Sequence, residues 1–302
     1  MPYLLNPDPI LIAVIGVTGA GKSTFINRAT GRSDLKVSDG PSSCTEDIDL
    51  SSLDVDGKRV VLVDTPGFDD SERTDADILT LMAKWLKTTY DKDTLLSGVI
   101  LLQQINEIKF KKSESNRTRL FEKICGEDAF NHVIIATTMW DAVRAETLDE
   151  CERRQQERIS TPHIWGEMHR LGAEVVKHDN TQRSALDIIR KLVNKSRVVL
   201  ALQDDLSKNG GVVANSAAGL FLNQQLGEKL ALVEAQLEEM KKDKKGLLDE
   251  ITELRNTVEN LKQQQTLLKT SQPDDEDTRW LTTLAAAASA LASVNTSFCA
   301  MM

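Results

Sequence analysis

A glycine-rich run, GVTGAGKS, occupies Gly16–Ser23 and is the part of the sequence whose residue types most clearly imply chemistry. Its spacing of glycine, four residues, glycine, lysine and serine is the pattern that wraps the phosphate chain of a nucleotide. The glycines let backbone N–H groups point inward, and a helix that starts directly afterwards adds the positive end of its dipole. The predicted phosphate-binding residues are Gly16, Thr18, Gly19, Ala20, Gly21, Lys22, Ser23 and Thr24.

A second motif, VVLVDTPG at Val60–Gly67, carries an aspartate from an apolar run into a tight turn. Asp64 is placed to hold a Mg²⁺ ion through water, and the Ser23 hydroxyl is placed to ligate it directly. Lys22 is expected to reach the β- and γ-phosphates, and the backbone N–H of Gly67 is expected to meet the γ-phosphate.

A polar loop, Val37–Glu46, lies between these two motifs and contains the run SSCT. A threonine in such a loop ligates Mg²⁺ only while the γ-phosphate is present, and this orders the loop. Thr45 is the predicted switch residue because it directly precedes the expected second strand; a turn without a nucleotide role is the alternative. The predicted metal ligands are Ser23, Thr45 and Asp64, and the predicted catalytic groups are Lys22, Thr45 and Gly67.

Phe68 follows the DTPG turn, where a glutamine would orient an attacking water, so we expect a low intrinsic rate of hydrolysis. A cation from the stretch Lys109–Arg119, such as Lys112 or Arg117, is one candidate for supplying charge to the phosphates of a paired subunit. A solvated basic face is the alternative interpretation of that stretch.

Base recognition is predicted near Thr138-Met139-Trp140-Asp141, which follows an apolar run at residues 133–136. This segment resembles the base-reading motif of GTPases, which is asparagine or threonine, lysine, any residue and aspartate; Asp141 is in place, whereas Met139 replaces the lysine. The flexible Met139 thioether can still cover a ring face. Ser184 and Ala185 resemble a loop that adds a backbone donor to the guanine oxygen. These features favour GTP over ATP.

Short apolar runs alternate with amphipathic stretches over the first 205 residues, which predicts a mostly parallel sheet covered by helices on both sides. The runs are expected at 11–15, 60–63, 99–102, 133–136 and 175–176, and helices at 24–30 and 74–88. Asp56-Gly57 is a hairpin signal that makes one edge strand antiparallel. The predicted fold is the α/β three-layer sandwich of P-loop nucleotide-binding proteins.

The composition changes to small residues at 206–222, which we interpret as a linker, and a seven-residue apolar period follows over 223–270. This stripe runs from Leu226 to Leu268 in steps of three and four and predicts a coiled coil. As one helix it would extend roughly 65 Å. A helix folded back onto the first domain is the alternative.

The last segment, 271–302, begins with an acidic run after Pro273 and has no charged side chain from Trp280 onward. Its many alanines, serines and threonines favour a packed or amphipathic helix, and weak membrane contact is the alternative. The net charge of −9 and the pI near 5.1 argue against nucleic-acid binding. Four widely separated cysteines and a start without a basic region predict a cytoplasmic protein, with membrane association left open.

The runs GVTGAGKST, SSCT and DTPGFDD resemble the immunity-associated, GIMAP-like branch of septin-related P-loop GTPases, over about residues 9–200. The resemblance implies guanine-nucleotide binding and self-association of the nucleotide-binding domain, often coupled to membranes. Met139 and Phe68 depart from the usual GTPase pattern.

The sequence therefore predicts a slow GTPase that binds Mg²⁺ and GTP or GDP, pairs through its first domain and coiled coil, and acts as a switch for assembly or recruitment. A coiled-coil scaffold that is merely stabilised by nucleotide is the second hypothesis. An ATPase or small-molecule kinase is a third, against which the DTPG turn and Asp141 argue.

Overall fold

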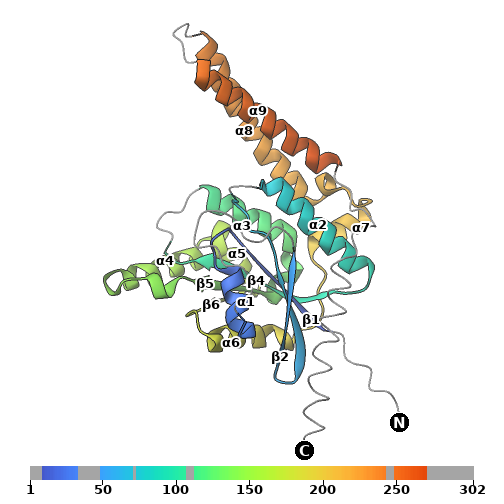
Figure 1. The fold of residues 1–302 in the computed structure, drawn as a ribbon, viewed down its shortest axis with the longest axis vertical. Coiled ribbons are helices and arrows are strands. Elements are labelled where there is room, and N and C mark those ends of the chain that lie inside the picture. Colours follow the sequence, from blue (N-terminus) through green and yellow to red (C-terminus); the bar gives the residue numbers. More distant parts are fainter. Residues whose placement is uncertain (1–8, 33–47, 71–72, 107–111, 243–247, 271–302) are drawn as a thin grey trace, which may run out of the picture.

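The computed structural model describes residues 9–32, 48–70, 73–106, 112–242 and 248–270. A six-stranded sheet in the order β2-β3-β1-β4-β5-β6 forms the centre of these residues (Figure 1). All neighbouring strands are parallel except the edge pair β2–β3. The strands are β1 (Ile10–Gly16), β2 (Asp49–Val55), β3 (Lys58–Asp64), β4 (Leu96–Gln104), β5 (Val133–Thr138) and β6 (Glu174–Lys177).

The sheet is buried on both faces because its central strands are apolar at nearly every position. Along β1, Leu11, Ala13 and Ile15 belong to one hydrophobic cluster, whereas Ile12 and Val14 belong to the cluster on the opposite face. This alternation follows from the two-residue period of a strand. The predicted three-layer α/β fold is confirmed.

Two helices, α1 (Lys22–Thr30) and α6 (Gln182–Val193), cover one face of the sheet. The other face is covered mainly by α2 (Asp75–Asp91), α3 (Lys112–Cys125) and α7 (Ala201–Lys208). Between β5 and β6 lie α4 (Leu148–Ser160) and the short α5 (Glu167–Arg170). The helices predicted after the glycine-rich run and over 74–88 are confirmed as α1 and α2.

The edge strand β2 turns into β3 at Asp56-Gly57, as predicted. Both residues have positive φ angles, 53° and 78°, and the Asp54 carboxylate accepts a hydrogen bond from the Gly57 N–H at 2.9 Å. Two left-handed residues match the natural twist of a two-residue hairpin loop.

The C-terminal part of the described chain is helical, but it forms two helices rather than one long one. Helix α8 (Ala217–Lys242) and helix α9 (Leu248–Thr270) lie side by side and project from the sheet domain (Figure 1). They run antiparallel, since Gln265 contacts Asn223 while Lys262 pairs with Glu234. The expected single helix of roughly 65 Å is therefore corrected to a helical hairpin.

Much of the predicted apolar stripe is packed inside this hairpin or against the sheet domain. Leu226, Leu237, Leu261 and Leu268 are buried. The described part of this apolar stripe is therefore covered by a neighbouring segment of the same chain, and a coiled coil between chains stays a prediction. The predicted boundaries at 205, 222 and 270 stay predictions: α7 and the start of α8 lie within or across the expected linker.

None of the described helices is both long and apolar enough to cross a membrane. The segment 271–302, for which membrane contact was the alternative prediction, lies outside the described residues.

Candidate nucleotide-binding site

The glycine-rich run connects β1 to α1 in a tight loop. Gly19 and Gly21 adopt φ angles of 80° and 89°, which non-glycine residues rarely reach, and Gly21 is the N-cap of α1. The N–H of Ala20 donates to the Val17 carbonyl at 3.1 Å, which closes the turn. A left-handed loop that ends at a helix N-terminus is the arrangement that binds phosphate groups through backbone donors.

Lys22 and Ser23 occupy the first turn of α1, next to the end of β3. The Lys22 ammonium donates to the carbonyls of Gly16 and Val17 at 3.3 and 3.1 Å. Burial lowers the pKa of Lys22 from 10.5 to about 8, although the carboxylates of Asp64 and Asp70 act in the opposite direction. A buried cation beside a helix N-terminus gives this loop a strong preference for anions.

The Ser23 hydroxyl donates to the Asp64 carboxylate at 2.8 Å. A hydroxyl and a carboxylate that meet at the end of a strand provide the hard oxygen ligands that Mg²⁺ prefers, and Mg²⁺ usually retains several waters and adds phosphate oxygens. The donor set of Ser23 and Asp64 therefore fits this ion. Thr45, the third predicted ligand, lies outside the described residues.

The DTPG turn passes very close to the glycine-rich loop. A Cβ atom at Gly67 would lie only 2.5 Å from the backbone nitrogen of Thr18, so only glycine fits there. The Thr18 N–H donates to the Phe68 carbonyl at 2.9 Å, and the Thr18 hydroxyl donates to the Asp70 carboxylate at 2.8 Å. Thr18 thus joins the two motifs, and its predicted contact with phosphate stays a prediction.

Phe68 is held by its backbone against the loop, while its side chain is buried in the main hydrophobic cluster. The backbone N–H of Phe68 donates to the Gly16 carbonyl at 3.3 Å. The position after the DTPG turn therefore anchors the segment in the core and places no polar group toward the loop.

The predicted cationic stretch is only partly described. Lys109 to Lys111 lie outside the described residues, and Arg119 is exposed on α3. Arg117 pairs with Asp69 at 2.9 Å within the same chain, so its guanidinium is directed toward the DTPGFDD run.

The predicted base-recognition segment adjoins the glycine-rich loop. Thr138 ends β5 and donates its hydroxyl to the Ala20 carbonyl at 3.0 Å. Met139 has a φ angle of 65°, and its terminal methyl lies 3.8 Å from the position that a Cβ on Gly21 would take. The thioether therefore lies beside the glycine-rich loop.

Asp141, the predicted guanine reader, is exposed and hydrogen-bonded to Asn180, which no sequence motif singled out. The Asn180 side-chain amide donates to the Asp141 carboxylate at 2.8 Å, and the Asn180 oxygen accepts from Arg28 at 3.2 Å. Asn180 is left-handed, with a φ angle of 63°. A polar Asp-Asn-Thr run after β6 was the available signal, since asparagine is one of the few residues that tolerate this conformation.

Ser184 and Ala185 do not form the loop that was expected of them. Helix α6 begins earlier, because the Thr181 hydroxyl caps it by accepting from the Ser184 N–H at 3.2 Å. The Ala185 N–H donates to the Thr181 carbonyl within the helix, and its side chain is buried. The loop beside Asp141 is therefore formed by residues 178–181.

His178, the first residue of this loop, packs against α1 and α6. It is buried, packs edge-on against Phe25 with ring centroids 5.0 Å apart, and hydrogen-bonds the Ser184 hydroxyl at 2.7 Å. Burial lowers its pKa, which favours the neutral imidazole. The packed, neutral ring thus joins Phe25 of α1 to Ser184 of α6, next to the loop that carries Asn180.

Comparison with known proteins agrees with this geometry. A family model described as 50S ribosome-binding GTPase matches residues 11–136. GTPase Der from Heliobacterium modesticaldum is 45% identical over 62 residues, which cover 20% of this chain and 14% of that protein. Der from Stenotrophomonas maltophilia strain R551-3 is 27% identical over 173 residues, 56% of this chain and 34% of that protein.

Among solved structures, Toc33 from Arabidopsis thaliana in complex with GDP and Mg²⁺ aligns with a TM-score of 0.52 at 14% identity. The alignment covers 65% of this chain and 88% of Toc33, and at this identity it shows the fold alone. The chain spans about a third or less of the length of the Der proteins it matches. Its N-terminal part has the α/β fold of P-loop GTPase G domains.

Proposed function

We propose that this chain binds GTP and GDP together with Mg²⁺, hydrolyses GTP slowly, and acts as a nucleotide-dependent switch. The observation that carries this proposal is the Ser23–Asp64 hydrogen bond at 2.8 Å beside the buried Lys22. These three groups combine an Mg²⁺-type oxygen pair with a cation for the phosphate chain. The family match over 11–136 and the Der and Toc33 likenesses support the same assignment.

The proposed roles follow from where each group lies. Lys22 neutralises the β- and γ-phosphates, and the backbone donors around Gly19 and Gly21 cradle them. Ser23 and Asp64 hold the ion, which when bound offsets the charge that develops on the transferring phosphoryl group. The Gly67 N–H, in the turn that passes close to Thr18, is assigned to the γ-phosphate.

Guanine selection is assigned to Asp141 with Asn180 as its positioning residue. Guanine presents two adjacent N–H donors, which one carboxylate can accept together. The bond from Asn180 orients that carboxylate, and Met139 covers the ring face.

Slow turnover and self-association complete the proposal. The buried Phe68 leaves its position without a water-orienting group, so a second subunit is the proposed source of rate enhancement. Dimerisation is important for the GTPase activity of the chloroplast translocon components atToc33 and psToc159, and the structure that shows this aligns with a TM-score of 0.50. Association through the G domain is therefore proposed here. The helical hairpin covers its own apolar stripe, so we do not assign dimerisation to it.

The immunity-associated branch remains our proposed placement within the GTPases. Both aspartates that follow Phe68 have partners in the structure: Asp69 pairs with Arg117, and Asp70 accepts a hydrogen bond from Thr18. These contacts hold the DTPGFDD run against α3 and the glycine-rich loop. The proposed location is the cytoplasm, which suits the free cysteines Cys125 and Cys151.

A nucleotide-stabilised scaffold with little hydrolysis is the second candidate, and the burial of Phe68 favours it. Competition of GTP and ATP against a fluorescent GTP analogue in Mg²⁺, on the full chain, tests nucleotide binding. Displacement by GTP alone supports the proposal; equal displacement by ATP contradicts guanine selection. Single-turnover phosphate release at rising protein concentration then separates the candidates, because only a dimerising GTPase accelerates with concentration.

A further inference from the structure

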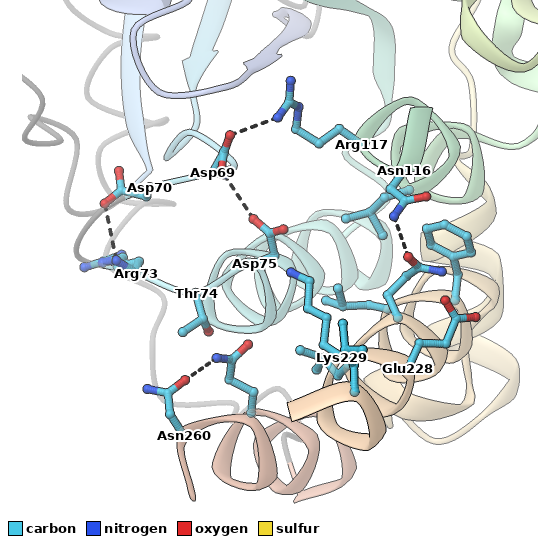
Figure 2. A pocket seen from close by; sticks show the side chains of 17 residues that line it. Asp69, Asp70, Arg73, Thr74, Asp75, Asn116, Arg117, Glu228, Lys229 and Asn260 are labelled. Carbon is cyan, nitrogen blue, oxygen red and sulfur yellow. Dashed lines mark hydrogen bonds and ion pairs between the residues drawn. The ribbon is translucent and has the colours of Figure 1, made fainter. Parts of the chain in front are cut away.

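A cavity of about 630 Å³ lies between the G domain and the helical hairpin. Its walls come from the segment after the DTPG turn, from the N-terminal half of α3 and from one face of α8 and α9 (Figure 2). Asp69, Asp70 and Arg73 form one side of it. The cavity therefore adjoins the segment that Thr18 ties to the phosphate loop.

The base of this cavity is apolar. Leu120 on α3 and Leu222 and Leu226 on α8 are buried there. Leu232, further along α8, also lines the cavity and remains 62% exposed. Leu232 therefore adds one exposed apolar side chain to a cavity whose base is already apolar.

The rim provides hydrogen-bonding groups. Asp75, at the start of α2, faces the cavity with the ammonium of Lys229 close to it in Figure 2. Asn260 accepts a hydrogen bond from Gln264 on α9, and both side chains line the opening. An apolar base with amide and carboxylate acceptors at its rim suits a tryptophan, whose indole combines a large apolar body with one N–H donor.

The sequence that follows α9 carries such a residue within a regular apolar stripe. Six residues spaced alternately by four and three positions share this stripe: Trp280, Leu284, Ala287, Leu291, Val294 and Phe298. On a helix this spacing puts all six on one face. The positions between them are mainly alanine, serine and threonine, and no side chain from 280 to 302 is charged.

The connection between this stripe and the cavity is short. Helix α9 ends at Thr270, six residues after Gln264, which corresponds to about 9 Å along the helix. The nine residues 271–279 then precede Trp280 and can span up to roughly 30 Å when extended. A tethered segment binds at a high effective concentration, so even a small apolar contact is enough to hold it in the cavity.

We propose that the segment Trp280–Phe298 docks into this cavity, with Trp280 and Leu284 packed against Leu226 and Leu232. The docked segment covers the exposed Leu232 and contacts the side of the cavity formed by Asp69, Asp70 and Arg73. It thereby places the tail beside the part of the chain that is joined to the phosphate loop. Docking of the tail does not depend on the proposed GTPase function. A change in docking when nucleotide binds would depend on it.

Photo-crosslinking in the full chain tests this docking. A p-benzoylphenylalanine at position 280 is irradiated in otherwise unchanged protein and in two variants, Leu232→Asp and Leu220→Asp. Leu220 is the matched control, because it lies on the same helix and is 59% exposed but does not line the cavity. Both leucines are exposed, so neither substitution opens the core. The same reporter at Ser289, off the stripe, controls for random contact.

The expected products are monomeric and join position 280 to peptides of α8 or α9 that contain Leu226, Leu232 or Asn260. Their yield falls roughly tenfold in Leu232→Asp and is unchanged in Leu220→Asp. Products only between chains, or equal yields in both variants, overturn the proposal. So does Trp280-dependent sedimentation with phosphatidylcholine–phosphatidylserine vesicles that Leu232→Asp leaves unchanged. Nucleotide affinity measured in parallel separates a failed dock from a failed GTPase assignment.

Discussion

Thr18 in the phosphate loop donates its hydroxyl to Asp70, 2.8 Å away and beyond the DTPG turn. The glycine-rich loop and the segment after the DTPG turn are thus joined by a side-chain bond as well as by the backbone bond from Thr18 to Phe68. A loop held in this way is preorganised, since less conformational freedom is lost when nucleotide binds.

Thr18→Val should weaken GTP affinity by roughly three- to tenfold, because valine keeps the shape of threonine but loses the hydrogen bond to Asp70. Thr88→Val is the matched control, because its half-buried hydroxyl bonds the Lys84 carbonyl within the last turns of α2 and not the glycine-rich loop. Isothermal titration of both variants measures the difference. Equal affinities for the two variants would show that the Thr18–Asp70 bond does not shape the site.

Lys22 predicts two opposite pH dependences. Burial lowers its pKa from 10.5 to about 8 in the nucleotide-free fold, so between these values the unfolded chain binds more protons than the folded one. Stability therefore rises with pH over this range, on the order of 2 kcal/mol relative to Lys22→Met. Nucleotide affinity falls over the same range, because the phosphates need the charged lysine.

Chemical unfolding of the nucleotide-free protein and of Lys22→Met, at about pH 7.5 and at about pH 10, checks the first trend. Titration of GTP at the same pH values checks the second. A stability difference between the two proteins that is flat with pH would contradict the buried, destabilised ammonium.

Asn180→Ala should reduce GTP affinity by roughly tenfold while leaving weak ATP binding unchanged, because the Asp141 carboxylate loses the amide that orients it. Asn194→Ala is the control, since this exposed asparagine follows α6 at its far end and its side-chain oxygen accepts a hydrogen bond from Lys58. Competition with a fluorescent GTP analogue reads out both. Loss of both GTP and ATP binding would show that Asn180 is needed for the folded structure rather than for guanine recognition.

Phe68→Gln should fail to accelerate hydrolysis, although it introduces the residue that orients water in other GTPases. The ring is 6% exposed and packed in the main cluster, so the substitution removes core volume and destabilises the fold by about 3 kcal/mol. Thermal unfolding and phosphate release measure both effects. A stable variant with faster hydrolysis would show that this position can face the γ-phosphate.

Most of the G domain was predictable because its signals are local. The glycine-rich run, the DTPG turn and Asp56-Gly57 each specify a backbone conformation from a few adjacent residues, and the structure confirms the elements around them. Ser23 and Asp64, both predicted to hold Mg²⁺, lie within hydrogen-bond distance, because motifs at the ends of neighbouring parallel strands and their helices meet at one edge. Their role as metal ligands stays a prediction.

The features that sequence reasoning missed depend on longer-range packing or on one cap. Thr181 starts α6 earlier than expected, which moved Ser184 and Ala185 out of the predicted loop and brought Asn180 beside Asp141. An apolar seven-residue period does not reveal whether a partner chain or the same chain covers it. The charged run before Gly246 was an available signal, since the two helices end and begin around it.

The most direct test of the proposed function is the nucleotide preference of Asp141→Asn, with Asp187→Asn as a charge-matched control on the exposed face of α6. Xanthine carries a carbonyl acceptor where guanine carries an amino donor. An asparagine amide, which can donate, therefore suits xanthine, whereas a carboxylate, which only accepts, suits guanine. We expect Asp141→Asn to lose GTP affinity by roughly 100-fold and to bind xanthosine triphosphate instead, while Asp187→Asn keeps GTP. Unchanged GTP preference in Asp141→Asn, or loss of both nucleotides, would contradict the assignment of this site as a guanine switch.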